Sequence, residues 1–225
     1  MKHYQTKKEM IYQSIKEKIY DGHYRPGEKI VIARIAKEYD CSDIPVREAL
    51  SLLESDKLIA FKPHVGAIVS HLSLDEIENI FNVRKVLEGY ATALATDHLK
   101  DEDIHKLEKI LSTADEAYNE HDYTNFNKLN NEFHMTIYNK SHNDILVQLI
   151  EDLWKNANRY DSVFEKNDTY IQQSIEEHYA ILKLLKEKNS TSAQEKMLKH
   201  MERVGSEIKK ISKKSFDQLT SLREM

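Results

Sequence analysis

The chain has 225 residues, of which 40% are hydrophobic and 32% are charged, with only five glycines and three prolines. This length allows one or two domains, and this composition is typical of long solvated helices around hydrophobic cores. No run approaches the roughly 18 uncharged apolar residues that span a bilayer, and residues 1–10 lack the apolar segment of a signal peptide. A single cysteine cannot form an internal disulfide. We therefore expect a cytoplasmic protein without a membrane partner.

Charge is distributed unevenly along the chain. Residues 1–74 contain 12 Lys and Arg against 10 Asp and Glu, whereas residues 75–225 contain 21 against 28. The slightly basic first part is the expected polyanion binder, although the net charge of the whole chain is −5. An excess of two positive charges is too small to identify DNA binding by charge alone.

Two helices are expected near the start. Apolar residues recur every four positions from Lys7 to Tyr20, which predicts a helix. A turn at Arg25-Pro26-Gly27 follows, because proline fixes φ and glycine tolerates the conformation that comes next. Apolar spacing then predicts a second helix over about 32–39.

A third helix is expected over about 43–55, with Ser42 as its N-cap and Pro45 in its first turn, where the missing N–H is not needed. Short β-prone runs on either side of 63–66 predict a hairpin. Three helices followed by a hairpin indicate a winged helix-turn-helix over residues 1–74.

A new set of helices begins at Ser73, where the run Ser-Leu-Asp-Glu predicts a capping box and a domain boundary. Helical periods and breaks predict six further helices, over about 75–97, 101–121, 123–140, 143–165, 169–188 and 191–213. Their short connections favour antiparallel packing. We therefore expect a mostly α protein, with an all-helical antiparallel bundle over residues 75–225. The stretch from residue 213 contains fewer apolar residues and is expected to fray.

Several motifs resemble one family. Arg25-Pro26-Gly27-Glu28-Lys29-Ile30, Pro45-Val46-Arg47-Glu48-Ala49-Leu50 and the hairpin glycine, Gly66, resemble the GntR family of regulators. Val83–Gly89, Glu132–His134, Glu177–Ile181 and Met197–His200 resemble its FadR-type subfamily, whose ligand-binding domain is called FCD. The resemblance covers about residues 7–211. It implies a homodimer whose two recognition helices read the halves of a palindromic operator. Of the two modes of regulation, repression is the one we expect, although the sequence does not distinguish it from activation.

The N-terminal part of the third helix is expected to meet base edges, with neighbouring groups on phosphates. Arg47 is the first choice for a base contact because its two-pronged donor suits guanine. The alternative for Arg47 is a surface arginine paired with Glu48 or Glu54. His64, at the hairpin tip, is expected either on phosphate or the minor groove or as an ordinary surface histidine. The expected DNA-binding set is Arg34, Ser42, Asp43, Ile44, Pro45, Arg47, His64 and Gly66.

Two positions depart from the family pattern. Asp43 stands where relatives usually have arginine, and Ile44 stands where they usually have threonine. A carboxylate repels phosphate but accepts from cytosine N4, so we expect an altered operator half-site.

Three histidines are candidates for a metal site. His134, His178 and His200 are flanked by apolar helical positions, so we expect them to point into the bundle. An isolated histidine of this kind is more often a hydrogen-bonded core residue, whereas three on separate helices can hold a transition metal. The resemblance favours a divalent metal of the Zn, Ni or Mn class. The histidines expected in solvent are His98, His105, His121 and His142.

In the family, an aspartate four residues before the first of these histidines supplies the fourth ligand; here the position is Asn130. An i to i+4 spacing places Asn130 on the face of His134. An amide oxygen brings no negative charge, so we expect a weaker metal site that depends more on an anionic ligand.

Arg84 matches the family arginine that faces the ligand cavity. A guanidinium fork grips a carboxylate at two points, so the expected effector is a small-molecule carboxylate that bridges Arg84 and the metal. The alternative is a surface pair between Arg84 and Glu88 at i+4. Asn156 and Arg159 are also expected to line the pocket.

These observations favour a ligand-responsive transcription regulator that is not an enzyme. One alternative is a metal-dependent hydrolase in which the histidine site activates water. The three histidines lie on separate helices, and no general base of the His-Glu-x-x-His kind accompanies them. The other alternative is a helical interaction module that does not bind DNA.

Overall fold

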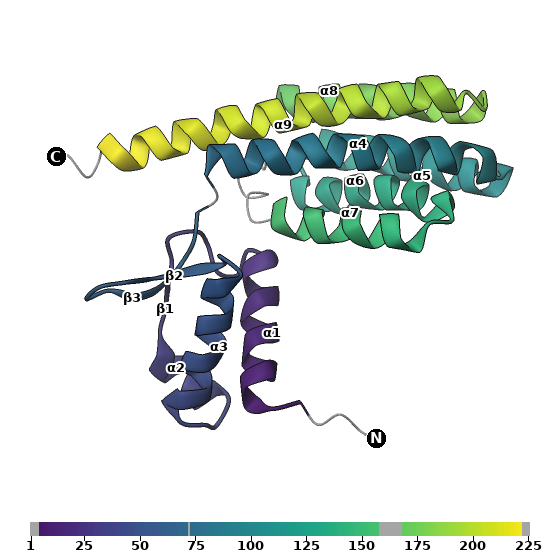
Figure 1. Cartoon of the computed structure of the whole chain (residues 1–225). Coiled ribbons are helices and arrows are strands. Elements are labelled where there is room, and N and C mark those ends of the chain that lie inside the picture. Colours follow the sequence, from purple (N-terminus) through teal and green to yellow (C-terminus); the bar gives the residue numbers. More distant parts are fainter. Residues whose placement is uncertain (1–4, 72, 158–167, 222–225) are drawn as a thin grey trace. The chain divides into compact units, whose positions relative to one another are not determined.

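The computed structural model describes residues 5–71, 73–157 and 168–221. The chain forms two compact units, one built principally from the residues up to Ser73 and the other principally from the residues from Leu74 onward (Figure 1). In the part of the chain that is described, no helix is both long and apolar enough to cross a membrane.

The first unit is a winged helix-turn-helix. Its elements are α1 (Lys7–Tyr20), β1 (Lys29–Ile30), α2 (Ile32–Glu38), α3 (Asp43–Ser55), β2 (Ile59–Lys62) and β3 (Gly66–Val69). The sheet order is β1-β3-β2, and both pairings are antiparallel. The expected hairpin is confirmed as β2–β3. Strand β1 was not expected, because a strand of two residues is too short for any periodicity and exists only through its pairing with β3.

The apolar stripe of α1 explains how this unit is held together. Ile11, Ile15 and Ile19 are at most 1% exposed and pack in one core with α3 and the sheet. Burying each such side chain stabilises the fold by about 1.5–3 kcal/mol. A capping box starts α1, in which the Thr6 side chain accepts from the Glu9 amide and the Glu9 carboxylate accepts from the Thr6 amide.

The start of α3 and the tip of the hairpin have distinctive local backbone conformations. Ser42 occupies the N-cap position as expected, with an extended backbone, although its side chain makes no capping hydrogen bond. Pro45 lies in the first turn as expected. At the hairpin tip His64 adopts φ of +62° and Gly66 adopts φ of +103°, so the chain reverses in a short loop that uses the left-handed region.

The second unit is entirely helical in its described residues. Its elements are α4 (Leu74–His98), α5 (Asp101–Asn119), α6 (Tyr123–Tyr138), the short 3-10 helix η1 (Asn139–Ser141), α7 (Asp144–Ala157), α8 (Asp168–Lys186) and α9 (Ser190–Ser221). The expected mostly α fold with a helical bundle is confirmed. The end of the helix expected over 143–165 lies outside the described residues. Helix α9 extends to Ser221, beyond the expected end at residue 213, and residues 206–221 contain no glycine or proline to end it earlier.

Helices α4 and α9 run side by side in opposite directions (Figure 1). Their close approach requires Gly205 on α9, because a Cβ atom there would lie 2.7 Å from the Cβ atom of Phe81. Such a distance is shorter than van der Waals contact, so any larger residue would push the helices apart. This packing encloses the side chains of the candidate site.

Candidate functional site

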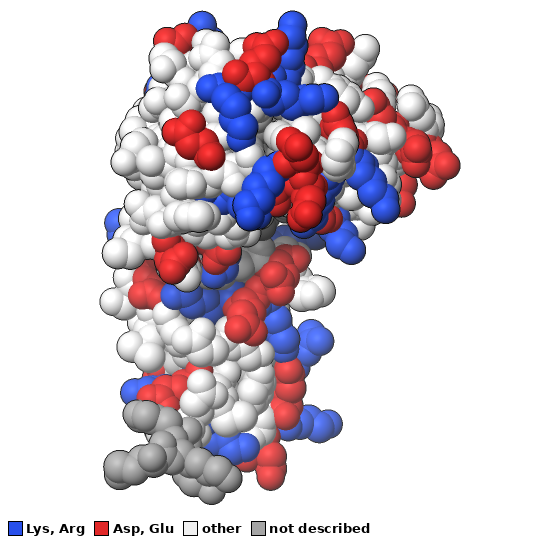
Figure 2. All heavy atoms as spheres, turned by 90° about the vertical axis from the view of Figure 1, so that its right-hand side faces the viewer, with Lys and Arg blue, Asp and Glu red and all other residues white. Residues whose placement is uncertain are grey.

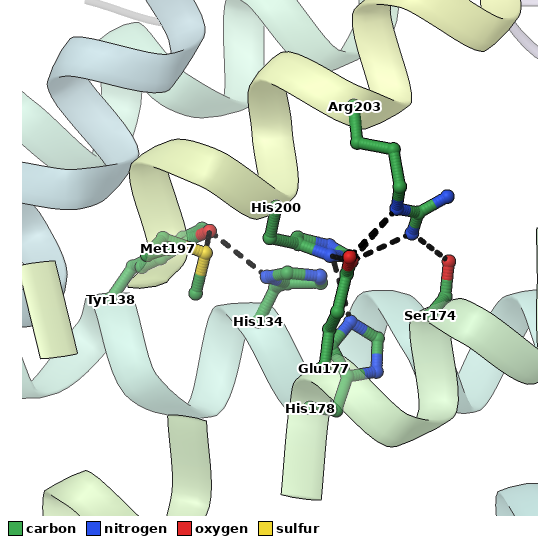
Figure 3. A network of polar contacts seen from close by, with 8 residues as sticks. All are labelled: His134, Tyr138, Ser174, Glu177, His178, Met197, His200 and Arg203. Atoms are coloured by element: carbon green, nitrogen blue, oxygen red, sulfur yellow. Dashed lines mark hydrogen bonds and ion pairs between the residues drawn. The ribbon is translucent and has the colours of Figure 1, made fainter. Parts of the chain in front are cut away.

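Three imidazoles meet inside the helical unit. His134 on α6, His178 on α8 and His200 on α9 are 2%, 1% and 3% exposed, which confirms that they point into the bundle. Their candidate ligand atoms all lie within 4.8 Å of one another. The Nε2 atoms of His178 and His200 are 3.3 Å apart (Figure 3). By contrast, the histidines expected in solvent are all exposed: His98, His105, His121 and His142.

The donor set fits a divalent transition metal. Two imidazole nitrogens bound tetrahedrally to one ion at about 2.0–2.1 Å lie about 3.3 Å apart, which matches the separation between His178 and His200. Burial lowers the pKa of His134 and of His178 well below the ordinary value and also lowers the pKa of His200. The imidazoles are therefore neutral, which is the form that binds metal.

Asn130, the expected fourth ligand, lies on α6 one turn before His134 and is half-buried. Its side-chain amide donates to the side chain of Asn131 at 3.3 Å. Its position on the same helical face is as expected from the i to i+4 spacing. Its role as a ligand stays a prediction.

A carboxylate and an arginine support His200. Glu177 accepts a hydrogen bond from Nδ1 of His200 at 2.6 Å, and Arg203 grips the same carboxylate through Nε at 2.8 Å and Nη2 at 2.7 Å (Figure 3). Burial alone would raise the pKa of Glu177, but the hydrogen bonds from His200 and Arg203 outweigh it and lower this pKa to about 2. Glu177 is therefore a carboxylate at any physiological pH.

A second ion pair, which is buried more deeply than the first, lies on α4. Arg84 is 7% exposed and donates through Nε to Oε1 of the fully buried Glu88 at 2.7 Å. The guanidinium also lies over the rings of Phe81 and Trp154, with its carbon 4.7 Å and 5.0 Å from their centres. The alternative expectation of a pair with Glu88 is thus correct in its partner and wrong in its location, because the pair is buried and not at the surface. Binding of an effector by Arg84 stays a prediction.

The carboxylate of Glu88 accepts three hydrogen bonds from described residues and connects Arg84 to the histidine cluster. Besides Arg84, Trp154 donates to Oε1 through Nε1 at 2.8 Å, and Tyr138 donates to Oε2 through its hydroxyl at 2.6 Å. The same hydroxyl lies 2.9 Å from Nδ1 of His134. Burial, and then the charge of Glu88, raise the pKa of Tyr138 well above its ordinary value, so its hydroxyl keeps the proton.

The two remaining expected pocket residues are not placed by the structure. Asn156 belongs to α7, but its side chain is outside the described residues, and Arg159 lies outside them entirely. Their contribution to a ligand pocket stays a prediction.

The expected DNA-contacting residues form an exposed surface at the start of α3. Ser42, Asp43, Ile44 and Arg47 are exposed, and Ile44 is 68% exposed, while Pro45 is half-buried.

The alternative expectation for Arg47 is not observed. Among the described residues Arg47 has no hydrogen bond or ion pair, and Glu54 instead accepts from the amide of Phe61. Arg34 on α2 and His64 at the hairpin tip are exposed, and Gly66 is half-buried. The role of these residues in DNA binding stays a prediction.

Sequence reasoning missed both the carboxylates behind the histidines and two lysines at the wing. Lys29 and Lys62 are exposed beside Gly66, with Lys62 paired to it across the hairpin and Lys29 within 3.6 Å of where its Cβ would lie. Tertiary pairing alone brings the two lysines together. On the face drawn in Figure 2, basic and acidic side chains are interspersed over the described residues. Charge distribution on that face therefore does not mark a DNA-binding surface.

Comparison with known proteins places both units in families. Residues 7–69 match the bacterial regulatory proteins of the gntR family, and residues 79–203 match the FCD domain. YdhC of Bacillus subtilis, an uncharacterized HTH-type transcriptional regulator, is 30% identical over 191 residues, which cover 84% of this chain and 85% of YdhC. The HTH-type transcriptional regulator McbR of Escherichia coli is 27% identical over 184 residues, which cover 80% of this chain and 82% of McbR.

A solved structure shows the same fold. The structure of E. coli McbR/YncC matches with a TM-score of 0.70 at 24% identity, and the match covers 91% of this chain and 98% of that one. The resemblance inferred from the motifs is confirmed. The chain belongs to the gntR family of bacterial regulatory proteins and combines a winged helix-turn-helix with an FCD domain.

Proposed function

We propose that this protein is a sequence-specific DNA-binding transcription regulator, acting as a repressor, whose operator affinity is controlled by a small organic acid at a metal site in the helical unit. The observation that carries the proposal is the buried cluster of three neutral imidazoles in a chain whose other unit presents the open end of a recognition helix. We propose a cytoplasmic homodimer on a palindromic operator, since a two-fold axis shared by protein and DNA is the usual arrangement for this motif.

His134, His178 and His200 would hold the metal, with Asn130 as the fourth protein ligand. A bound ion of the Zn, Ni or Mn class would supply a positive centre for an oxygen atom of an acid. None of these four side chains carries a negative charge at neutral pH, which favours an anionic effector to complete the site.

Arg84 is suited to hold the other end of such an acid. Only its Nε donates to Glu88, and among the described residues its two terminal amino groups have no protein acceptor. A carboxylate can therefore bind these two groups in the two-point geometry that guanidinium favours. The effector can change DNA affinity only if it binds two arrangements of the dimer with different affinity.

For DNA recognition we propose that Arg47 binds guanine and that Asp43 accepts from cytosine N4. The exposed Ile44 side chain is suited to a thymine methyl group. Selection of bound sites from random DNA tests this assignment with the wild type and the variant Asp43→Arg. We expect an altered half-site for the wild type and a changed preference for the variant. Recovery of the usual family half-site by both would refute it.

The enzymatic alternative requires a free base beside the metal. Both oxygens of Glu177 are occupied by His200 and Arg203, and both oxygens of Glu88 are occupied as well. Neither carboxylate is placed to accept a proton from water, which supports a regulator over a metal-dependent hydrolase. The interaction-module alternative leaves the exposed start of α3 without a role.

A gel shift with the DNA upstream of the protein's own gene tests the proposal, repeated with Zn²⁺ and a panel of small organic acids. We expect a shifted complex whose affinity changes when metal and one acid are present together. Turnover of a substrate would support the hydrolase, and a chain that neither shifts DNA nor turns over substrate would support the interaction module. Analytical ultracentrifugation at the same concentration tests the homodimer.

A further inference from the structure

The carboxylates of Glu88, which is fully buried, and Glu177, which is partly buried, are not ligands in the proposed metal site, yet both are connected to its histidines by hydrogen bonds. Each is held by an arginine, Arg84 for the first and Arg203 for the second. Placing two ion pairs beside the cluster contributes little net stability, because desolvation offsets most of their attraction. We therefore expect these charges to have a role at the histidines.

The contact to Glu177 decides where the proton of His200 lies. An ionised carboxylate only accepts, so the 2.6 Å contact requires a hydrogen on Nδ1 of His200. A neutral imidazole has one N–H, so Nε2 of His200 carries the free lone pair. That atom faces the other histidines in Figure 3.

For His134, a chain of two hydrogen bonds through Tyr138 to Glu88 determines which ring nitrogen carries the proton. Glu88 takes the proton of the Tyr138 hydroxyl in a 2.6 Å hydrogen bond, so the hydroxyl oxygen is left to accept from Nδ1 of His134 at 2.9 Å. Nε2 of His134 then also carries a free lone pair, and this nitrogen points away from Tyr138 toward the other histidines in Figure 3.

His178 differs from the other two. In the described part of the chain no carboxylate lies within ion-pair distance of its ring. Its Nε2 is 3.3 Å from Nε2 of His200, which has no hydrogen, so the hydrogen between the two atoms belongs to His178. Without metal, His178 therefore carries its proton on the atom that a metal would bind.

We infer that Glu88, acting through Tyr138, and Glu177 are positioning residues that hold His134 and His200 ready for a metal ion, and that His178 is the ligand whose ring proton moves from Nε2 to Nδ1 when the ion binds. This inference rests on the proposed metal site. No proton leaves the protein in that step, since His178 stays neutral. Carboxylates behind metal-binding histidines fix the ring orientation and increase ligand basicity.

Imidazole ¹⁵N NMR of the full chain without metal tests the hydrogen-bond assignment directly, with each signal assigned by single His→Gln substitution. We expect the proton on Nδ1 in His134 and His200 and on Nε2 in His178. On titration with Zn²⁺, only His178 should change its tautomer. A metal-free spectrum with the proton of His134 or His200 on Nε2 would overturn the inference.

Zn²⁺ affinity, measured by competition with a chelator, tests the positioning role. We expect Glu177→Gln and Tyr138→Phe to weaken Zn²⁺ binding by roughly 10- to 100-fold. The matched controls, Glu176→Gln on the exposed side of α8 and Tyr179→Phe, whose hydroxyl contacts only Asp115 in the described residues, should change it by less than about twofold. Equal affinity of all four variants would overturn the inference.

The two experiments separate this inference from the proposed function. A wild-type chain that shows the expected tautomers but binds none of Zn²⁺, Ni²⁺ and Mn²⁺ overturns the metal site and the positioning role together. A wild-type chain that binds metal, with Glu177→Gln and Tyr138→Phe folded and binding equally well, overturns only the positioning role. If a variant fails to fold, the wild-type tautomers with and without Zn²⁺ still decide the question.

Discussion

Arginines in the two units lie in opposite environments. Arg84 and Arg203 in the helical unit are largely buried, and each is paired with a carboxylate that also binds the histidine network. Arg34 and Arg47 in the winged unit are exposed, and Arg47 has no ion pair among the described residues. This contrast fits the proposed roles, since Arg84 would be oriented before a small ligand binds, whereas Arg47 would stay solvated until a duplex orders it.

Buried and exposed arginines also differ in the free energy needed to hold their charge. A buried charge needs a partner because the interior solvates it poorly, so the helical unit can hold these arginines only with Glu88 and Glu177 in place. An exposed arginine is solvated by water and needs no partner. Changes to buried charge should therefore affect stability, and changes to exposed charge should affect binding.

The largest expected effect is the response of the metal-free protein to acid. The unfolded chain binds protons at its histidines near pH 6.5, whereas His134, His178 and His200 with their lowered pKa values do not bind them when folded. The unfolded state thus binds more protons, and the free energy of unfolding should fall as pH drops from 6.5 to about 5, by up to about 1.4 kcal/mol per pH unit for each histidine.

Urea denaturation at several pH values, followed by the fluorescence of the single tryptophan, Trp154, measures this slope. Glu177, whose folded pKa is about 2, contributes stability that is lost only below about pH 5, where the unfolded carboxyl group takes up a proton, so the histidine slope is read between pH 6.5 and about 5. His178→Gln should reduce the slope by about one proton's share. A free energy that does not change across the window would contradict the burial of neutral imidazoles.

Removing a buried carboxylate should have the next largest effect. Glu88→Ala should lower the free energy of unfolding by about 3–5 kcal/mol, because Arg84 would remain buried without its partner. Trp154 fluorescence in urea reports on this unit. The control is Glu202→Ala, an exposed partner of Lys85, which should cost less than about 1 kcal/mol. Similar losses for both variants would remove the distinction between buried and exposed pairs.

Removing an exposed arginine should affect DNA binding instead. Arg47→Ala should weaken operator binding by about 1–3 kcal/mol, roughly 5- to 150-fold, with little change in stability. Fluorescence anisotropy at one fixed salt concentration measures it. The control Lys57→Gln removes one charge next to the opposite end of α3 and should have a much smaller effect. Equal losses would mean that Arg47 contributes charge alone.

The smallest expected effect is the loss of an exposed ion pair in the winged unit. Lys18 and Glu38 lie 2.7 Å apart with about a third or more of each side chain exposed. Glu38→Gln should cost only about 0.2–1 kcal/mol, and less at high salt, because water and ions screen the pair. Far-UV circular dichroism in urea at low and high salt measures it. A loss as large as that of Glu88→Ala would show that exposure does not control these energies.

Most helices were predictable because apolar residues recur with the helical period, as Ile11, Ile15 and Ile19 show for α1. The site was predictable in part: an apolar neighbourhood on each helix identified His134, His178 and His200 as buried. Glu88 and Tyr138 were not predicted as members of the site, because they lie 50 residues apart in the sequence and meet only when α4 packs beside α6.

Other features depend on pairing or packing that periodicity does not express. Strand β1 exists only because β3 lies beside it, and Ser42 occupies the N-cap position without a capping bond. The burial of the Arg84–Glu88 pair is another feature that the sequence does not predict, since an i to i+4 spacing predicts the contact and not its burial.

The amino-acid sequence by itself determined the helices, the wing, the family and the three histidines, because apolar periodicity and short motifs are local properties of the chain. Only the tertiary structure decided which side chains form hydrogen bonds with the histidines. Glu177 directly precedes His178 in the sequence, yet it binds His200. Adjacent residues on a helix point about 100° apart, so Glu177 faces α9 and not the side chain of its neighbour.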